Sequence, residues 1–208
     1  MCGINGFNFQ DEKLIRKMMT HTKNRGPDFN NFIQNEKITI GHDRLSILDL
    51  NERSNQPFCF KNLVLSFNGE IYNYRKLRDE LVKEGYVFKT TSDTEVVIYL
   101  FHKYGLEAFK KLSGIFAIAI WDNLNETLYL VRDIVGVKPL YYSELPKNKI
   151  IFSSSIKSIL SLNNKNTLNE KALFYYKNIG RNEGAETFFS GIYKLLPGQI
   201  LIQKKDLP

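Results

Sequence analysis

The hydrophobic pattern of this chain changes period along its length, and the order of the changes limits the folds open to it. Apolar residues recur at helical spacing over residues 74–83 and again up to Tyr104, whereas from Gly114 onwards apolar and polar residues alternate as they do in strands. Strand-like segments also precede the first of these helices. Because helices stand between two groups of strands, the pattern favours an α+β fold with antiparallel sheets over a doubly wound fold.

Turn and capping residues give approximate limits to these elements. Asn73 and either Ser92 or Asp93 are the expected helix N-caps, and Glu95 stands at capping-box spacing from Ser92. Asn68-Gly69 after an apolar run is typical of a turn. We expect strands at residues 2–9, 31–34, 37–40, 63–67, 114–121, 127–132, 140–144, 149–153 and 200–203, and helices at residues 11–19, 74–83, 92–104, 156–162 and 170–176.

Composition excludes several classes of protein. The longest uncharged apolar run among the 208 residues is eight residues, 114–121, whereas a membrane span needs about 20. Acidic and basic residues at positions 11–13 interrupt the region where a signal peptide has its apolar stretch. The net charge of +7 comes from dispersed, mostly lysine residues with no basic run longer than a pair. We therefore expect a cytoplasmic chain with no membrane and no nucleic-acid partner.

Cysteine and histidine usage argues against a metal or disulfide framework. The chain has two cysteines and three histidines, with no CxxC or HxxxH pattern, so we expect no metal site. Cys59 lies in the apolar run Pro57-Phe58-Cys59-Phe60, which predicts a core thiol.

Cys2 is the first candidate for chemistry. If the initiator Met1 is removed, one residue carries both a thiol and a free α-amino group, which titrates near ~7.7–8.0. That amine can take the thiol proton and later return a proton to a leaving amine, so no histidine is required. From this short segment alone, a frayed residue without function is the competing interpretation.

Four further polar residues have both a catalytic and a structural interpretation. The side chain of Asn68 and the backbone N–H of Gly69 can form an oxyanion hole, or simply a turn. Arg44 can bind a carboxylate in bidentate fashion, or form a surface ion pair. Asp93 and Glu70 can accept from an α-ammonium group, although Asp93 also suits a helix cap.

Taken together, several ordered segments resemble one family. They are Met1-Cys2-Gly3-Ile4, Arg25-Gly26-Pro27-Asp28, GHDRLSILD at 41–49, Gln56-Pro57, FNGEIYNY at 67–74, TSDTE at 91–95, LSGIFA at 112–117, Val131-Arg132-Asp133 and GVKPLYY at 136–142. In this order they resemble the amino-terminal glutaminase domain of glutamine-hydrolysing asparagine synthetase, a class II glutamine amidotransferase of the Ntn-hydrolase type. The resemblance covers essentially the whole chain.

The resemblance implies a four-layer αββα sandwich of two antiparallel sheets, formed by residues 2–208 as one glutaminase domain. It implies that Cys2 is the nucleophile, with Asn68 and Gly69 as the oxyanion hole. L-Glutamine is the implied substrate, bound by Arg44 at its α-carboxylate and by Asp93 and Glu70 at its α-ammonium. The implied pocket is also lined by the segment Leu45, Ser46, Ile47 and Leu48.

The resemblance also implies a partner that this chain does not contain. Family members carry an ATP-dependent synthetase domain with a Ser-Gly-Gly-x-Asp-Ser loop, and no such segment occurs here. We expect no cofactor in the glutaminase domain, ATP and Mg only on the synthetase domain, and that domain either in a longer chain or as a separate subunit. Asparagine is the expected product, a sugar acid or peptide carboxylate is the alternative acceptor, and a homodimer is left open.

Two other hypotheses and three departures from the family remain. The chain is either a glutaminase, a non-catalytic regulatory domain of the same fold, or a conventional Cys–His hydrolase with His42 or His102 as its base. Asp43, Ile134 and Ser155 stand where the family is expected to have arginine, arginine and glutamate.

Overall fold

The computed structural model describes residues 1–162, 167–182 and 184–204; residues 205–208 of the expected domain lie outside the described residues. The strands are β1 Gly3–Phe7, β2 Phe29–Gln34, β3 Thr39–Arg44, β4 Phe58–Phe60, β5 Leu63–Ile71, β6 Gly114–Asp122, β7 Thr127–Arg132, β8 Tyr141–Leu145, β9 Lys149–Ser153, β10 Tyr193–Lys194 and β11 Ile200–Lys204. The helices are α1 Glu12–Thr20, α2 Tyr74–Lys83, α3 Asp93–Tyr104, α4 Ala108–Lys111, α5 Ile156–Leu160 and α6 Glu170–Ile179, with 3₁₀ turns at Lys23–Arg25, Glu52–Ser54 and Gly105–Glu107.

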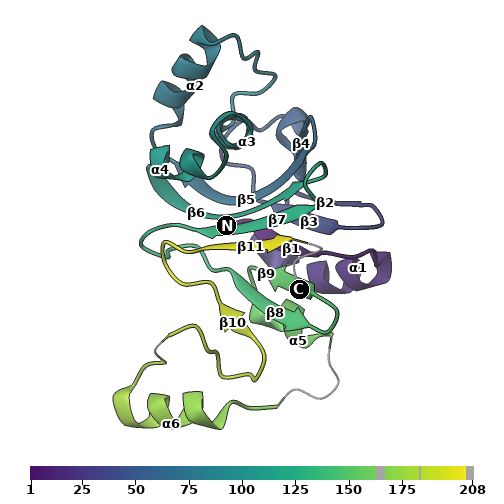
Figure 1. The fold of residues 1–208 in the computed structure, drawn as a ribbon, viewed down its shortest axis with the longest axis vertical. Coiled ribbons are helices and arrows are strands. Elements are labelled where there is room, and N and C mark those ends of the chain that lie inside the picture. Colours follow the sequence, from purple (N-terminus) through teal and green to yellow (C-terminus); the bar gives the residue numbers. More distant parts are fainter. Residues whose placement is uncertain (163–166, 183, 205–208) are drawn as a thin grey trace.

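These strands form two antiparallel sheets that pack face to face (Figure 1). One sheet has the order β10-β8-β9-β1-β3-β2 and the other β11-β7-β6-β5-β4. Helices α2 and α3 cover the outer face of the second sheet, and α1 and α5 pack against the first. The α+β class and the αββα layering predicted from the sequence are therefore confirmed.

The alternation of side chains along β5 shows how the layers are built. Leu65 and Phe67 point toward α2 and α3, whereas Val64 points into the space between the two sheets. Polar residues occupy the same inward-facing register, because Ser66 and Asn68 follow Val64 at period two and are buried. The inner face of β5 thus passes from an apolar core to a polar end.

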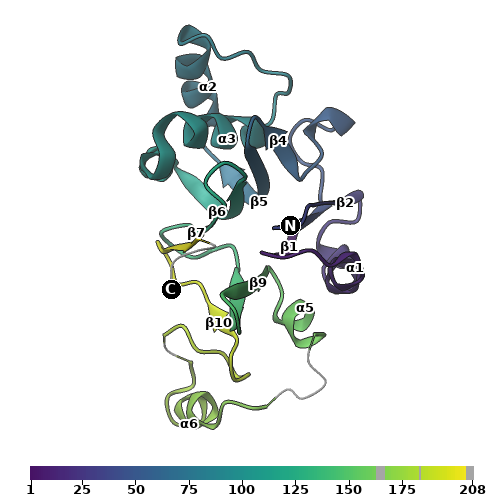
Figure 2. The same ribbon diagram turned by 45° about the vertical axis from the view of Figure 1, so that its right-hand side comes forward.

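A third apolar cluster joins α1 and α5 to the first sheet. Phe7, Ile15, Met18, Ile151 and Ile159 are buried in it. Helix α6 lies at the end of the molecule opposite α2 in both views (Figures 1 and 2). No helix among the described residues is long and apolar enough to cross a bilayer.

The turn predicted at Asn68-Gly69 is wrong, because β5 continues through both residues to Ile71. Gly69 lies opposite Phe116 of β6, and a Cβ atom on Gly69 would stand 2.7 Å from the Phe116 Cα. The glycine therefore serves a close strand–strand approach, a requirement set by a residue far away in the sequence.

One predicted cap and the predicted capping box also differ from the structure. The Asn73 side chain makes no cap for α2; it accepts from Ser113 N at 3.0 Å and donates to Lys111 O at 2.9 Å. Ser92 is the N-cap of α3, as predicted, with its Oγ accepting from Thr94 N at 3.0 Å. The capping box is absent, because Glu95 accepts from a preceding loop instead.

Cys59 is exposed, so the prediction of a core thiol is wrong. It lies on β4, the edge strand of its sheet, between two aromatic residues that pack against the helix-covered core, Phe58 and Phe60. Alternation then points Cys59 away from that core. The apolar run alone does not distinguish an edge strand from a central one.

Candidate active site

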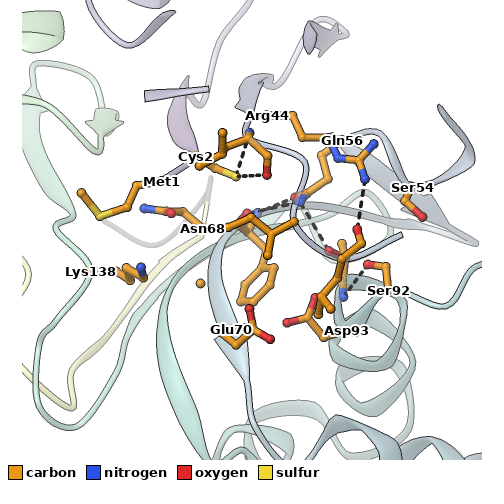
Figure 3. Close-up of a pocket in the computed structure, with 16 residues that line it drawn as sticks. Met1, Cys2, Arg44, Ser54, Gln56, Asn68, Glu70, Ser92, Asp93 and Lys138 are labelled. Carbon is orange, nitrogen blue, oxygen red and sulfur yellow. Dashed lines mark hydrogen bonds between the residues drawn. The ribbon is translucent and has the colours of Figure 1, made fainter. Parts of the chain in front are cut away.

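A pocket opens where the chain start, the end of β3, the end of β5 and the start of α3 meet (Figure 3). The predicted residues that line it are Cys2, Arg44, Leu45, Ile47, Leu48, Asn68, Gly69, Glu70 and Asp93. Ser46 is the one predicted site residue outside this lining; its N–H donates to Asp28 Oδ2 at 2.7 Å. The pocket therefore brings together nearly the whole set predicted from the sequence.

Cys2 is held by its backbone and its sulfur. Its carbonyl accepts from Arg25 Nε at 3.1 Å, and its Sγ accepts from Leu45 N at 3.4 Å. Burial raises the pKa of the Cys2 thiol, against the lowering effect of the Leu45 N–H and of the nearby charges of Arg44 and Lys138. A thiol with a raised pKa is protonated near neutral pH, so nucleophilic attack requires a base.

No histidine is placed to be that base. Neither His42 nor His102 lines the pocket. His42 is buried with its Nδ1 3.0 Å from Ser66 Oγ, and burial together with Arg44 lowers its pKa to about 3. His102, near the end of α3, contacts Tyr86. The pocket does not support the Cys–His hydrolase hypothesis.

Met1 does line the pocket, beside Cys2. It is half exposed, with a relative exposure of 54%. Removal of Met1 would make the backbone nitrogen of Cys2 an α-amino group at the same location. The base expected from the sequence is thus compatible with the position of Cys2.

Asn68 provides a donor that the fold does not use. The residue is 1% exposed, and its Nδ2 has no hydrogen-bond partner among the described residues. Leaving a buried amide donor unpaired costs about 1–3 kcal/mol. Since Asn68 lines the pocket, this donor is available to a ligand.

Gly69 lines the same pocket, and its backbone N–H points away from the neighbouring strand β6. Phe116, opposite Gly69, uses its own backbone groups on the other side, since its N–H donates to Asp133 Oδ2 at 3.2 Å and its C=O accepts from Asp133 N at 2.9 Å. Hydrogen-bond direction alternates along an antiparallel strand, so Gly69 directs its N–H away from β6. On that side β4 pairs only as far as Leu65. The Gly69 N–H therefore lies beyond the end of β4.

Side chains replace the missing strand on either side of Gly69. Gln56 accepts from Phe67 N at 2.7 Å and donates to Phe67 O at 3.2 Å. Asp93 Oδ2 accepts from Ile71 N at 3.0 Å. Gly69 lies between these two residues. The backbone N–H groups of Phe67 and Ile71 are therefore hydrogen-bonded by side chains, whereas the Gly69 N–H remains the candidate oxyanion donor.

Glu70 and Asp93 form an acidic end to the pocket, and Figure 3 shows their carboxylates facing each other. Burial, together with the negative charge of Glu70, raises the pKa of Asp93 to about 7, although the Ile71 N–H opposes this. A cation bound between the two carboxylates would relieve both the repulsion and the desolvation. The arrangement suits an α-ammonium group.

Arg44 is more heavily engaged than the sequence predicts. Its two terminal nitrogens donate to the carbonyls of Leu48 at 3.3 Å and Asn51 at 3.1 Å, to Asn55 Oδ1 at 2.6 Å and to the Asp49 carbonyl. These bonds hold the loop of residues 45–51, and among the described residues no partner is found for Nε. A bidentate bond from Arg44 to a carboxylate would have to replace at least one of its bonds to a loop carbonyl. Binding of the substrate carboxylate by Arg44 therefore stays a prediction.

The pocket also has lining residues that the sequence reasoning did not assign: Met1, Ser54, Gln56, Phe67, Ser92, Thr94 and Lys138. Lys138 is brought there by its preceding loop. Asp133 accepts from the N–H groups of Gly136 at 2.7 Å and Lys138 at 3.2 Å, and Arg132 donates to Lys138 O at 2.9 Å. The only sequence signal for Gln56, Asp133 and Lys138 was their place in the family-like segments.

The three departures from the family pattern lie outside this pocket lining. Asp43 accepts from Thr22 Oγ1 at 2.6 Å, and burial raises its pKa to about 6. Ile134 is 85% exposed, and Ser155 is the N-cap residue of α5. None of them alters the described lining. Among the described residues no group of three or more His, Cys, Asp or Glu side chains could hold a metal ion.

A model of the family described as glutamine amidotransferase domain matches residues 1–207. The chain belongs to this family. Asparagine synthetase [glutamine-hydrolyzing] 1 of Bacillus subtilis is 37% identical to this amidotransferase domain over 216 residues, which cover 99% of the chain and 34% of that protein. A putative asparagine synthetase [glutamine-hydrolyzing] 2 of Methanocaldococcus jannaschii is 35% identical over 99% of the chain and 44% of that protein. The resemblance inferred from the sequence is confirmed.

Solved structures agree at the level of the fold. A structure described as the allosteric regulatory enzyme of purine biosynthesis superposes with a TM-score of 0.72 at 19% identity, over 99% of the chain and 47% of that protein. The amidotransferase domain spans less than half the length of each of these proteins. The asparagine synthetases among its relatives are enzymes that extend well beyond this domain.

Proposed function

We propose that this amidotransferase domain hydrolyses L-glutamine to glutamate and ammonia, with Cys2 as the nucleophile. One observation carries the proposal. Cys2, Asn68 and Gly69 line one pocket, whose acidic end is formed by Glu70 and Asp93. Within the described part of the chain Asn68 Nδ2 has no hydrogen-bond partner, and the Gly69 N–H points away from β6. A nucleophile, two oxyanion donors and an ammonium site are the groups that amide hydrolysis of an amino acid side chain requires.

The reaction follows from these positions. Once Met1 is removed, the α-amino group of Cys2 takes the thiol proton, and Sγ attacks the side-chain amide carbon of glutamine. The carbonyl oxygen becomes an oxyanion that accepts from Asn68 Nδ2 and Gly69 N–H. The amine then returns the proton to the leaving nitrogen, ammonia departs, and a γ-glutamyl thioester remains. Water attacks the thioester carbon and releases glutamate and the thiol.

The substrate is held by its other end. Asp93 and Glu70 bind the α-ammonium, and Arg44 binds the α-carboxylate through Nε or by exchanging a loop carbonyl. Leu45, Ile47 and Leu48 line the side of the pocket, and Ser46 belongs to the same segment but lies outside the lining. These contacts are made in the ground state and in the transition state alike, so they act mainly on KM.

Ammonia produced here would serve an ATP-dependent amide synthesis, with asparagine formed from aspartate as the favoured product because both relatives above are asparagine synthetases. A sugar acid or a peptide carboxylate is the alternative acceptor. We propose that the synthetase partner, in a longer chain or as a separate subunit, holds ATP and Mg. Isothermal titration of this domain with Mg-ATP tests that division, and micromolar binding would contradict it.

The proposal is tested by the state of the chain start. A protein beginning at Cys2 should release glutamate from glutamine, whereas an uncleaved extension before Cys2 should lower the rate by about 10²–10⁴-fold, the usual contribution of general-base catalysis. Cys59→Ser is the matched control, because it removes the other thiol at an exposed site outside the pocket. Undiminished turnover by the blocked protein would contradict the amine base. No turnover by the native protein would favour the non-catalytic regulatory alternative.

A further inference from the structure

The residues proposed to bind the α-carboxylate and the α-ammonium of glutamine belong to separate segments of the chain. Arg44 is the last residue of β3 and holds the loop of residues 45–51 by hydrogen bonds, whereas Asp93 begins α3. A ligand that bridges them is recognised only if the distance between the segments is fixed.

Asp49 links these segments directly. Its Oδ2 accepts from Thr91 N at 2.6 Å, two residues before Asp93, and its Oδ1 accepts from Asn51 N at 3.2 Å within its own loop. The Asp49 side chain is 4% exposed. Its φ of +46° is in the left-handed region, which aspartate and asparagine tolerate better than most residues.

The same residue is tied to Arg44 through its backbone, because the guanidinium donates to the Asp49 carbonyl. Asp49 therefore joins the carboxylate-binding end to the ammonium-binding end through one side chain. A second, longer link runs from Gln56 Nε2 to Thr94 Oγ1 at 3.4 Å. Of the two, only the Asp49 link uses a charged acceptor, which makes the stronger hydrogen bond.

The charge on Asp49 is stable. Burial raises the pKa of this carboxyl, but the hydrogen bonds from the Thr91 and Asn51 N–H groups outweigh burial, and the pKa is lowered to about 2. The group is ionised throughout the physiological range, so the link does not depend on pH there. Both carboxylate oxygens accept backbone N–H groups, and an asparagine side chain has only one oxygen to offer.

We infer that Asp49 is a positioning residue that sets the spacing between Arg44 and Asp93, and so makes binding depend on a substrate with both an α-carboxylate and an α-ammonium group. Asp49 does not line the pocket and touches no reacting atom. The inference rests on the proposed function, because it takes glutamine as the ligand.

The test separates recognition from turnover. In a Cys2→Ala background, isothermal titration measures the affinity for L-glutamine and for glutaramate, which is glutamine without the α-ammonium. Adding Asp49→Asn should weaken glutamine binding by about tenfold, the effect of losing roughly one charge-assisted hydrogen bond, and weaken glutaramate binding much less. The preference for glutamine over glutaramate should therefore shrink.

Asp122→Asn is the matched control. Asp122 is likewise a buried turn carboxylate, 6% exposed, and its Oδ1 accepts from Leu124 N at 2.9 Å, but it lies outside the pocket. It should leave both affinities unchanged. Equal weakening of both ligands by Asp49→Asn, or no weakening, would overturn the role of Asp49 alone. Failure of the Cys2→Ala parent to bind glutamine would instead overturn the proposed function, and this inference with it.

A measurement on the unaltered protein covers the case in which Asp49→Asn does not fold. Thr91 is an exposed residue, yet its N–H is bonded to Asp49. Amide hydrogen exchange should show Thr91 protected, and more so when glutamine is bound. Exchange at the rate of an unstructured amide would contradict the link.

Discussion

The first turn of α3 carries two buried carboxylates, Glu95 and Asp93, which face different regions of the molecule and differ in their hydrogen-bond partners. Glu95 faces the loop of residues 87–90 and accepts from Lys89 N at 2.9 Å, Thr90 N at 2.7 Å and Tyr99 Oη at 2.7 Å. Asp93 faces the pocket, where it accepts from Ile71 N and lies close to Glu70. The loop completes the hydrogen bonding of its carboxylate internally, whereas the pocket leaves negative charge for a ligand.

Two buried asparagines repeat this contrast. Asn5 donates to Thr22 Oγ1 at 2.6 Å and accepts from Ser153 Oγ at 2.8 Å, so both ends of its amide are paired. Asn68 is equally buried, but its Nδ2 has no partner in the part of the chain that the structure describes. Interior polar groups that are paired stabilise the fold, and those left unpaired in the pocket mark where it binds and reacts.

The largest effect is expected at the two asparagines. Asn68→Ala removes an oxyanion donor and should lower kcat by about 10²–10³-fold with KM changed much less. It should cost little stability, since the lost donor was unpaired. Asn5→Ala should do the reverse, lowering the free energy of unfolding by about 1–3 kcal/mol while the folded protein keeps its kcat. Steady-state kinetics and thermal unfolding measure both, and a loss confined to KM in Asn68→Ala would exclude the oxyanion role.

A smaller effect is expected in the pH dependence of binding. Only ionised Asp93 neutralises an ammonium group, and its pKa is raised to about 7. KM for glutamine should therefore rise as pH falls below about 7, by up to about tenfold per unit until the carboxyl titrates in the complex. Asp93→Asn should raise KM at pH 8 and abolish this dependence. A KM profile that stays sloped in Asp93→Asn would assign the titration to another group.

Asp93 should also make the free energy of unfolding depend on pH, with the opposite sign to that of a salt-bridged aspartate. Between its ordinary pKa of 3.8 and about 7, Asp93 holds its proton in the folded state more often than in the unfolded state. The free energy of unfolding therefore falls as pH rises through this window. Thermal unfolding at pH 8 should show Asp93→Asn more stable than the parent.

The smallest effect on activity is expected at Glu95. Glu95→Gln removes an acceptor from a set of donors that needs both oxygens, so the free energy of unfolding should fall by about 1–3 kcal/mol. At a temperature where the variant is folded, kcat and KM should stay within about twofold of the parent. A change in the pH profile of KM would show that Glu95 also influences the binding of glutamine, which would contradict the purely structural role of its carboxylate.

The sequence predicted the parts of the fold that depend on local pattern. Helix α2 spans Tyr74–Lys83 as expected, and the order of strands and helices defined the class. The predictions from sequence were wrong where a residue's structure depends on a partner far away in the sequence. Pairing with Phe116 keeps Gly69 in a strand, and the edge position of β4 exposes Cys59.

The residues of the candidate site also differ in how far the sequence alone could predict them. Cys2, Asn68 and Asp93 were predictable because their chemistry is carried by residue type in a recognisable segment. The roles of Gln56 and Asp49 were not, because each acts by replacing or joining backbone that only the folded chain brings together. Arg44 was predicted as a carboxylate clamp, and its engagement with loop carbonyls depends on a loop conformation that no spacing rule gives.

The central claim, that Cys2 attacks glutamine from the chain start, is tested most directly by trapping the intermediate. The protein that begins at Cys2 is mixed with L-glutamine, quenched in acid within a turnover and analysed by peptide mass spectrometry. A γ-glutamyl adduct should be found on the peptide that begins with Cys2, and it should be absent in Cys2→Ala and in protein with a blocked amino terminus. Glutamate release at the parent rate by Cys2→Ala, or an adduct on Cys59 instead, would contradict the account.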